Sequence, residues 1–244
     1  MITLEDAMKV YHSDIITGLD TSMFSDADIL NILLQRSEVL NDQPKPGKII
    51  RAWTNGDTGP IDDIIARMGH DLIKRAAAFI YLEFLELRPH LDQLSLKRVA
   101  DIGCGYAFVD LFMSKTYDND IVLIDIEENE HRHFGFEDEG AAYTSLSVAR
   151  AMLEGNGIAA DRITTINPNT HDLGAVEPVD LVTSFVSCGF HYPYDMYMDF
   201  YKTGVVSDGF ILLDLRRRKA DAGIEGLSAL GSVDVIEEAA YGSA

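Results

Sequence analysis

The chain has 244 residues and carries 20 basic against 40 acidic side chains, a formal charge of −20. Binding to nucleic acid or to an anionic membrane surface depends on clustered Lys and Arg, so this charge argues against both kinds of partner. No stretch approaches the roughly 20 apolar residues of a membrane-spanning helix, and the first residues lack the basic and apolar blocks of a secretory signal. Because the two cysteines also suit a reducing compartment, we expect a cytoplasmic protein.

The first third of the chain has a helical pattern. Residues 26–40 place apolar side chains at helical spacing, which predicts one helix with a buried face. Two prolines in the segment 41–48 interrupt it, and the glycine-containing segment 51–60 has the composition of an irregular loop.

The second long helix is expected to begin near Pro60, because proline is favoured in the first turn of a helix. Its apolar residues extend over 61–87, and Pro89 is expected to end it near residue 88. We therefore predict that residues 1–96 form an N-terminal helical extension that covers a substrate.

From residue 97 the pattern changes to short apolar runs that alternate with helical segments. Runs such as IVLID and FILLDL are apolar almost throughout, which indicates strands buried on both faces and hence a mostly parallel sheet. The alternation predicts a doubly wound α/β sandwich over residues 97–244. The predicted strands are 98–102, 121–126, 162–167, 179–185 and 209–215, with a candidate sixth strand at 232–238; the predicted helices are 107–117, 142–155, 193–203 and 221–230.

The most distinctive stretch is VADIGCGYA at residues 99–107, where an apolar run ends in an acid and a glycine turn follows. Gly103 and Gly105 lack a Cβ, so the chain can turn sharply and a ligand can approach the backbone closely. A dinucleotide-binding fingerprint requires Gly or Ala at the position of Phe108, whose side chain is too large. The spacing therefore argues against a dehydrogenase.

This stretch resembles the first motif of class I S-adenosylmethionine-dependent methyltransferases, an acid followed by glycines at alternate positions, with Ala107 in place of the third glycine. The resemblance extends over about residues 97–215, roughly half the chain. It implies the α/β fold of that family and S-adenosylmethionine as the cofactor. It also implies that Asp101 anchors the methionine part of the cofactor, directly or through water, and that the turn Gly103, Cys104 and Gly105 lies against the cofactor.

The ends of the second and third strands supply further contacts that the resemblance implies. Asp125, beside Ile126, would accept hydrogen bonds from both ribose hydroxyls. After the third strand, Asn169 occupies the position at which the family often has an acid. Either Asn169 or Asp172 would therefore meet the adenine amino group.

The segment after the fourth strand is expected to lie beside the transferred methyl group. By the same resemblance, Ser184 and Phe185 would lie under the cofactor. His191 follows a few residues later, and a neutral imidazole can take the proton of an attacking hydroxyl near pH 7. His191 as a packing residue at a helix entry is the alternative. Tyr192 is expected to line the pocket of the acceptor.

Two other segments carry candidate acceptor contacts. Trp53 could stack on a sugar or aromatic ring while Arg51 holds an anionic group, and Tyr143 lies near the start of a predicted helix. His131 and His133 have the alternate spacing of two ligands on an extended chain, but no third ligand has convincing spacing. We therefore predict no metal site.

Taken together, these features predict a methyltransferase that transfers a methyl group to a hydroxyl of a small metabolite, such as a sugar, with His191 as the general base. Methylation at nitrogen or carbon is an alternative, since an amine needs no base. The other alternative is a non-catalytic domain that keeps the fold as a binding or scaffold module. The expected partner is a small molecule rather than nucleic acid or a membrane, and a homo-oligomer is left open.

Overall fold

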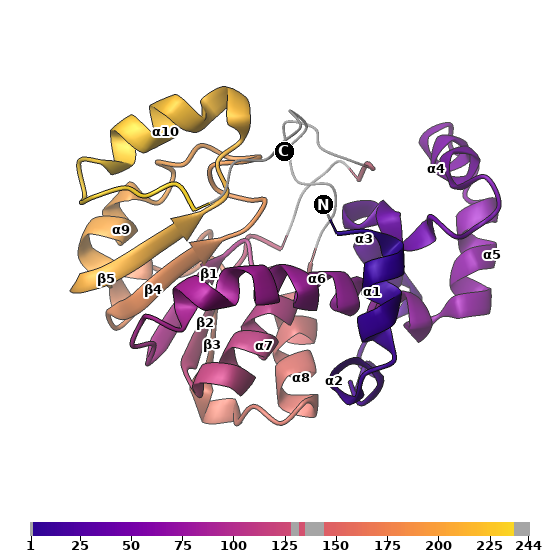
Figure 1. The fold of residues 1–244 in the computed structure, drawn as a ribbon, viewed down its shortest axis with the longest axis horizontal. Helices are drawn as coiled ribbons and strands as arrows, with labels where there is room; N and C mark the ends of the chain where they lie inside the picture. The colour runs from indigo at the N-terminus through magenta and orange to yellow at the C-terminus, as the bar shows by residue number, and fades with distance from the viewer. Residues whose placement is uncertain (1, 128–131, 135–143, 237–244) are drawn as a thin grey trace.

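The computed structural model describes residues 2–127, 132–134 and 144–236. Its centre is a five-stranded sheet with the order β3-β2-β1-β4-β5 (Figure 1). Every pair of neighbouring strands is parallel, and the strand order reverses at β1. This confirms the predicted doubly wound α/β fold. The strands are β1 (Arg98–Ile102), β2 (Asp120–Ile124), β3 (Ile163–Ile166), β4 (Val179–Ser184) and β5 (Val205–Leu213).

Each face of the sheet has its own apolar core, because successive side chains of a strand point to opposite faces. Val99 and Ile121 belong to the cluster formed with helices α6, α7 and α8. Ala100 and Val122 belong to the other cluster, together with Phe200 of α9 and the partly buried end of α10. These helices are α6 (His70–Leu91), α7 (Phe108–Tyr117), α8 (Leu146–Gly155), α9 (Met198–Gly204) and α10 (Ala220–Leu227).

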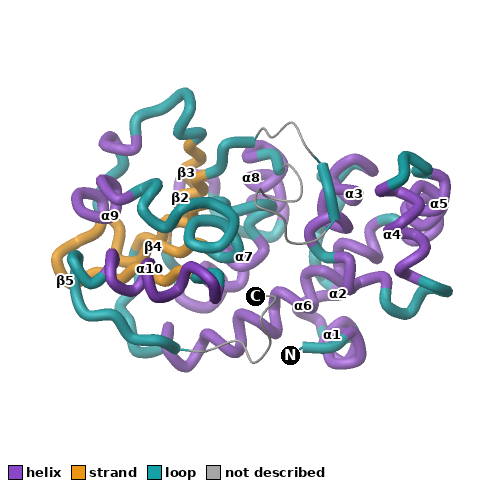
Figure 2. Tube along the Cα trace, turned by 90° about the horizontal axis from the view of Figure 1, so that it is seen from above, coloured by secondary structure: helices purple, strands orange, loops and turns teal. Residues whose placement is uncertain are grey.

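The N-terminal helices gather at one side of the sheet, and α6 extends from this group across the sheet's helical layer (Figures 1 and 2). Two of them begin at capping boxes, one between Thr3 and Asp6 and one between Ser25 and Asp28. The first helical turns are therefore stabilised by their own sequence. The segments are α1 (Leu4–Tyr11), α2 (Asp14–Thr17), α3 (Asp26–Gln35), the 3₁₀ turn η1 (Ser37–Leu40), α4 (Pro46–Thr54) and α5 (Gly59–Met68). An N-terminal helical extension is confirmed, whereas the boundary between residues 96 and 97 stays a prediction.

Two helices of this extension differ from the prediction in where they break. The helix expected over 26–40 ends at Gln35 and continues only as the tighter turn η1. The helix expected over 61–87 is two helices, because Gly69 between them has φ of +50°, which a continuous helix does not allow.

Prolines account for two more differences. Pro46 opens α4, so part of the predicted loop 51–60 is helical and carries Arg51 and Trp53. Pro89 lies inside α6 rather than ending it, since backbone hydrogen bonding continues past it from the Asp92 N–H to the Arg88 carbonyl at 2.8 Å.

The last strand is also displaced from its predicted position. β5 begins at Val205, which lies opposite Val179 of β4. The register then shifts, so that Leu181, two residues further along β4, lies opposite Phe210. Residues 232–236 are not a strand, and the rest of the expected sixth strand lies outside the described residues. The short turns η2 (Ala160–Arg162), η3 (Leu173–Ala175) and η4 (Arg217–Lys219) complete the described elements. None of the helices in the described part of the chain has the length and apolar character needed to cross a membrane.

Candidate active site

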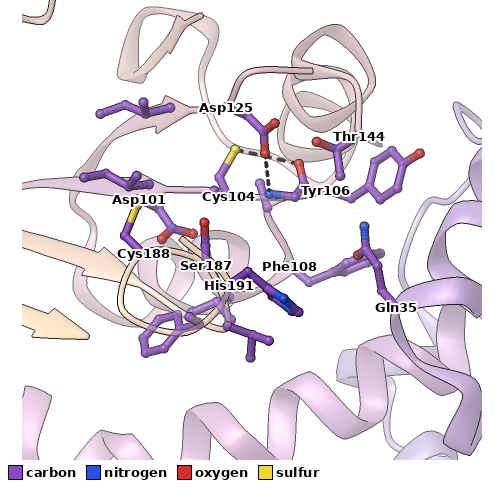
Figure 3. A pocket seen from close by; sticks show the side chains of 18 of the residues that line it. Gln35, Asp101, Cys104, Tyr106, Phe108, Asp125, Thr144, Ser187, Cys188 and His191 are labelled. Atoms are coloured by element: carbon purple, nitrogen blue, oxygen red, sulfur yellow. Dashed lines mark hydrogen bonds between the residues drawn. The ribbon is translucent and has the colours of Figure 1, made fainter. Parts of the chain in front are cut away.

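A cavity of about 400 Å³ lies at the carboxyl ends of β1, β2 and β4. This is where the strand order reverses, the position at which open α/β sheets bind ligands. Residues of α3, η1 and α6 form its opposite wall. Figure 3 shows Asp125, His191 and Gln35 pointing into the same space from three sides. The cavity therefore lies between the sheet and the N-terminal helices.

The glycine turn forms the part of the cavity next to β1. Gly103, Gly105 and Ala107 have φ of +74°, +58° and +60°, so all three lie in the left-handed region. The turn is tied to β2 by a hydrogen bond from the Gly103 N–H to the Ile124 carbonyl at 2.7 Å. Ala107 keeps the backbone conformation that the third glycine of the motif favours, at the position that begins α7. At Gly103 and Gly105 the turn therefore exposes its backbone to the cavity without an intervening side chain.

Asp125 is held beside this turn, directly after β2. Its carboxylate accepts a hydrogen bond from the Gly105 N–H at 3.3 Å (Figure 3) and another from the Glu127 N–H at 3.0 Å. Burial raises the pKa of Asp125 above its ordinary value, while these two N–H donors oppose the rise. Ile126 lines the cavity beside it. The result is an oriented carboxylate that can accept hydrogen bonds from hydroxyl groups of a ligand.

Asp101 lies deeper, on β1, with only 4% of its surface exposed. It accepts a hydrogen bond from the Thr183 hydroxyl at 2.8 Å, and the carboxyl group of Asp110 on α7 lies nearby. Burial is the main cause that raises the pKa of Asp101 to about 6, and it also raises the pKa of Asp110 well above its ordinary value. The neighbouring carboxyl group of Asp101 adds to the rise in the pKa of Asp110, because two negative charges side by side are unfavourable. Sequence reasoning missed Asp110, although an acid among Phe108, Val109 and Leu111 on an apolar helix was a visible signal.

The loop after β4 forms the wall next to the glycine turn. Phe185, Ser187 and Cys188 line the cavity, and a Cβ at Gly103 would overlap the Ser187 side chain. Ser184 does not line it. Its hydroxyl donates to the Ile102 carbonyl at 2.7 Å and accepts from the Cys188 N–H at 2.9 Å, so this side chain holds the strand end together.

His191 belongs to the same wall. Its side chain lines the cavity although only 6% of the residue is exposed. The turn that carries it closes through a hydrogen bond from the His191 N–H to the Ser187 carbonyl at 2.9 Å. Tyr192 lines the cavity next to it. The imidazole of His191 and the phenol ring of Tyr192 therefore both lie near the glycine turn.

The opposite wall comes from helices of the N-terminal extension, through side chains that sequence reasoning did not single out. Gln35 and Arg36 lie at the end of α3, and Glu83 lies on α6. The Arg36 guanidinium donates two hydrogen bonds of 2.6 Å to the Glu83 carboxylate, a bidentate pair, and a weaker one of 3.4 Å to Glu38. The positive charge of Arg36 is thus compensated where it borders the cavity.

Tyr106 of the glycine turn connects the two walls. Its hydroxyl donates to Asp28 of α3 at 2.8 Å and accepts from the Asn31 amide at 3.1 Å. Its ring packs edge-on against Phe24, with a centroid distance of 5.2 Å. The N-terminal helices therefore contact the glycine turn directly.

Four predicted site residues lie away from the cavity. Asn169 and Asp172 are exposed beyond β3, where Asp172 accepts a hydrogen bond from the Gly174 N–H at 2.8 Å. Trp53 packs edge-on against Phe134, at 5.3 Å between ring centroids, and neither Trp53 nor Arg51 lines the cavity.

Two remaining sequence predictions concern Tyr143 and a metal site. Tyr143 lies outside the described residues. Within the described ranges no group of three His, Cys, Asp or Glu side chains is arranged to hold a metal ion.

The chain matches no protein-family model and no curated protein sequence. It is similar in structure to precorrin-6y C5,15-methyltransferase from Geobacter metallireducens GS-15, at 20% identity over 65% of this chain and 72% of that one, with a TM-score of 0.42. A SAM-dependent methyltransferase from Thiobacillus denitrificans, in complex with S-adenosyl-L-homocysteine, matches at 16% identity over 60% and 54% of the two chains, with a TM-score of 0.37.

The plantazolicin methyltransferase BpumL, in complex with a pentazolic desmethylPZN analog and SAH, matches at 18% identity over 85% of this chain and 65% of that one, with a TM-score of 0.37. The chain spans less than two thirds of the length of these last two proteins. Because the sheet order establishes the fold by itself, the function has to be argued from the site.

Proposed function

We propose that the protein is an S-adenosylmethionine-dependent methyltransferase that methylates a hydroxyl group of a small, uncharged molecule such as a sugar. The observation that carries this proposal is the glycine turn with Asp101 and Asp125 at the ends of neighbouring strands, all bordering one cavity. The same set was expected from the resemblance of residues 99–107 to the methyltransferase motif.

The residues of this half of the cavity fit the chemistry of that cofactor. The left-handed turn at Gly103 and Gly105 lets a ligand reach the backbone, since no Cβ fills the space. Asp125 would accept the ribose hydroxyls, and Asp101 would balance the positive charge of the methionine part. When bound, the cofactor supplies an electrophilic methyl group on a positively charged sulfur.

His191 is the candidate general base for a hydroxyl acceptor. It lies in the wall that follows β4, and its imidazole can take the hydroxyl proton as the new bond to the methyl carbon forms. Tyr192 and Gln35 border the same space and would hold other polar groups of the acceptor. Alignment of the acceptor oxygen with the methyl group contributes to the rate of such a transfer, and the two facing walls of the cavity would provide it.

The charges around the cavity favour an uncharged acceptor over a phosphorylated one. Among the described residues that line it, the carboxylates are Glu38, Glu83, Asp101, Asp125 and Glu127. Arg36 supplies a guanidinium, and no lysine of the described residues lines the cavity. Because Arg36 is paired with Glu83 and Glu38, an anionic acceptor would lose its hydration without gaining a cation. A sugar or another polyhydroxylated molecule is an acceptor without a negative charge. A cytoplasmic location stays a prediction.

Calorimetric titration with S-adenosylmethionine and S-adenosylhomocysteine tests the cofactor assignment. Micromolar binding of both is the expected result, and a screen of neutral and phosphorylated sugars for methyl transfer then tests the acceptor. A folded sample that binds neither ligand would contradict the proposal and favour a non-catalytic domain. Transfer to phosphorylated acceptors in preference to neutral ones would contradict the charge argument alone.

A further inference from the structure

The chain enters the left-handed region directly after β4. Val186 has φ of +53° and lines the cavity between Phe185 and Ser187. A β-branched residue is rarely found in this region, because its branched side chain crowds the backbone. Such strain persists only where the surrounding structure enforces it, and it gathers at functional sites.

Asp214, the first residue after β5, forms a contact that can hold Val186 in this conformation. Its Oδ2 accepts a hydrogen bond from the Val186 N–H at 3.0 Å, and its own N–H donates to the Ser184 carbonyl at 3.1 Å. The second bond continues the pairing of the two strands, in which Ser184 lies opposite Leu213. Asp214 therefore holds the chain on both sides of Phe185, where β4 ends and the strained turn begins.

The loop that follows is seated between the glycine turn and the end of β5. At its start, Ser187 packs so closely on Gly103 that a Cβ there would overlap it. Further along, a Cβ on Gly189 would lie 2.7 Å from the Asp214 carbonyl oxygen, and the Arg216 N–H donates to the Gly189 carbonyl at 3.0 Å. A change in the direction of the chain at Val186 would therefore move this wall relative to the glycine turn.

We propose that Asp214 is a positioning residue, which holds Val186 in the left-handed conformation and so sets the loop from Phe185 to His191 against the glycine turn. This inference rests on the proposed function, because the loop is the wall that would face the bound cofactor. Asparagine at this position keeps an acceptor oxygen for the Val186 N–H, whereas alanine removes it.

The test compares Asp214→Ala and Asp214→Asn with wild type and with Asp208→Ala, a control at an exposed acid of β5. Calorimetry with S-adenosylhomocysteine measures affinity, and amide hydrogen exchange measures protection at Val186. Asp214→Ala should weaken binding about tenfold and speed exchange at Val186, since one hydrogen bond to a charged acceptor is lost. Asp214→Asn should stay within about threefold of wild type, and Asp208→Ala should change neither quantity.

The double variant Asp214→Ala with Val186→Gly separates positioning from a general loss of stability. Glycine adopts φ of +53° without strain, so the double variant should bind the probe at least about threefold more tightly than Asp214→Ala alone. Wild-type affinity in Asp214→Ala, or no recovery in the double variant, would overturn the assignment. If wild type does not bind S-adenosylhomocysteine, the proposed function fails. The role of Asp214 is then tested by hydrogen exchange alone, and equal protection of the Val186 amide in Asp214→Ala and wild type would overturn it.

Discussion

The two walls of the cavity are built in different ways. The sheet wall depends on a short segment whose backbone conformations need glycine or a small residue, with Gly103, Gly105 and Ala107 all at positive φ. The helical wall depends on side-chain pairs between residues far apart in the chain, such as Arg36 with Glu83 and Tyr106 with Asp28. The first wall leaves a local signature in the sequence, and the second leaves none.

This contrast also separates the roles that we assign to the walls. The sheet wall presents backbone and oriented carboxylates, which suit a cofactor of constant chemistry. The helical wall presents Gln35 and the compensated pair of Arg36 and Glu83, which suit selection of an acceptor. Substitutions confined to one wall test whether the two walls act separately.

Gly103→Val should have the largest effect. The new side chain would overlap Ser187 and would have to adopt φ of +74°, so affinity for S-adenosylhomocysteine should fall at least about 100-fold. Gly56→Ala is the matched control, because Gly56 has φ of +85° with open space around it and does not line the cavity. Calorimetry on cooperatively folded samples checks both variants. Near-wild-type affinity in Gly103→Val would show that the cofactor does not use this turn.

His191→Ala should lower turnover about 100-fold while affinity for S-adenosylhomocysteine stays within about threefold of wild type. The reason is that a general base acts on the acceptor proton rather than on the cofactor. Initial rates with an acceptor found in the screen measure this effect, and His171→Ala, at an exposed histidine, is the control. An unchanged rate would remove His191 from the mechanism and favour transfer to nitrogen or carbon.

Asp110→Asn should stabilise the protein at neutral pH. Burial raises the pKa of Asp101 to about 6 and that of Asp110 well above its ordinary value, so the folded state keeps protons that the unfolded state releases near pH 4. The free energy of unfolding therefore falls as the pH rises from about 4 to about 6 and beyond. Removing one acid should increase it by about 1–3 kcal/mol at pH 7 and change it little below pH 4.

Urea unfolding at several pH values measures this difference, with Asp172→Asn as an exposed control. A variant that is equally stable or less stable than wild type at pH 7 would contradict the raised pKa values of Asp101 and Asp110.

Tyr106→Phe should have the smallest effect, a loss of about 1 kcal/mol in the free energy of unfolding. The variant removes the hydroxyl that donates to Asp28 and accepts from the buried Asn31. Tyr81→Phe is the control, at a tyrosine whose ring packs on Phe112 at 4.9 Å. Equal stability of Tyr106→Phe and wild type would indicate that the glycine turn and α3 are held together by ring packing alone.

Sequence alone determined the α/β class, the position of β1 and the glycine turn. Apolar runs buried on both faces have few alternatives to a parallel sheet, and a turn at positive φ has few alternatives to glycine. The strand ends then place Asp101 and Asp125 at one edge, because parallel strands all end there. These features follow from backbone geometry, which acts within a few residues.

Tertiary structure decided what depends on distant partners. The pKa of Asp110 is raised because the folded chain buries this side chain next to Asp101. The charge of Arg36 is compensated because α6 brings Glu83 to it. Asn169 and Trp53 fit the expected chemistry as residue types but lie away from the cavity. Packing free energy is summed over the whole chain, so it overrides local preference wherever the two disagree, as at Val186, whose strain is offset by contacts that only the folded chain supplies.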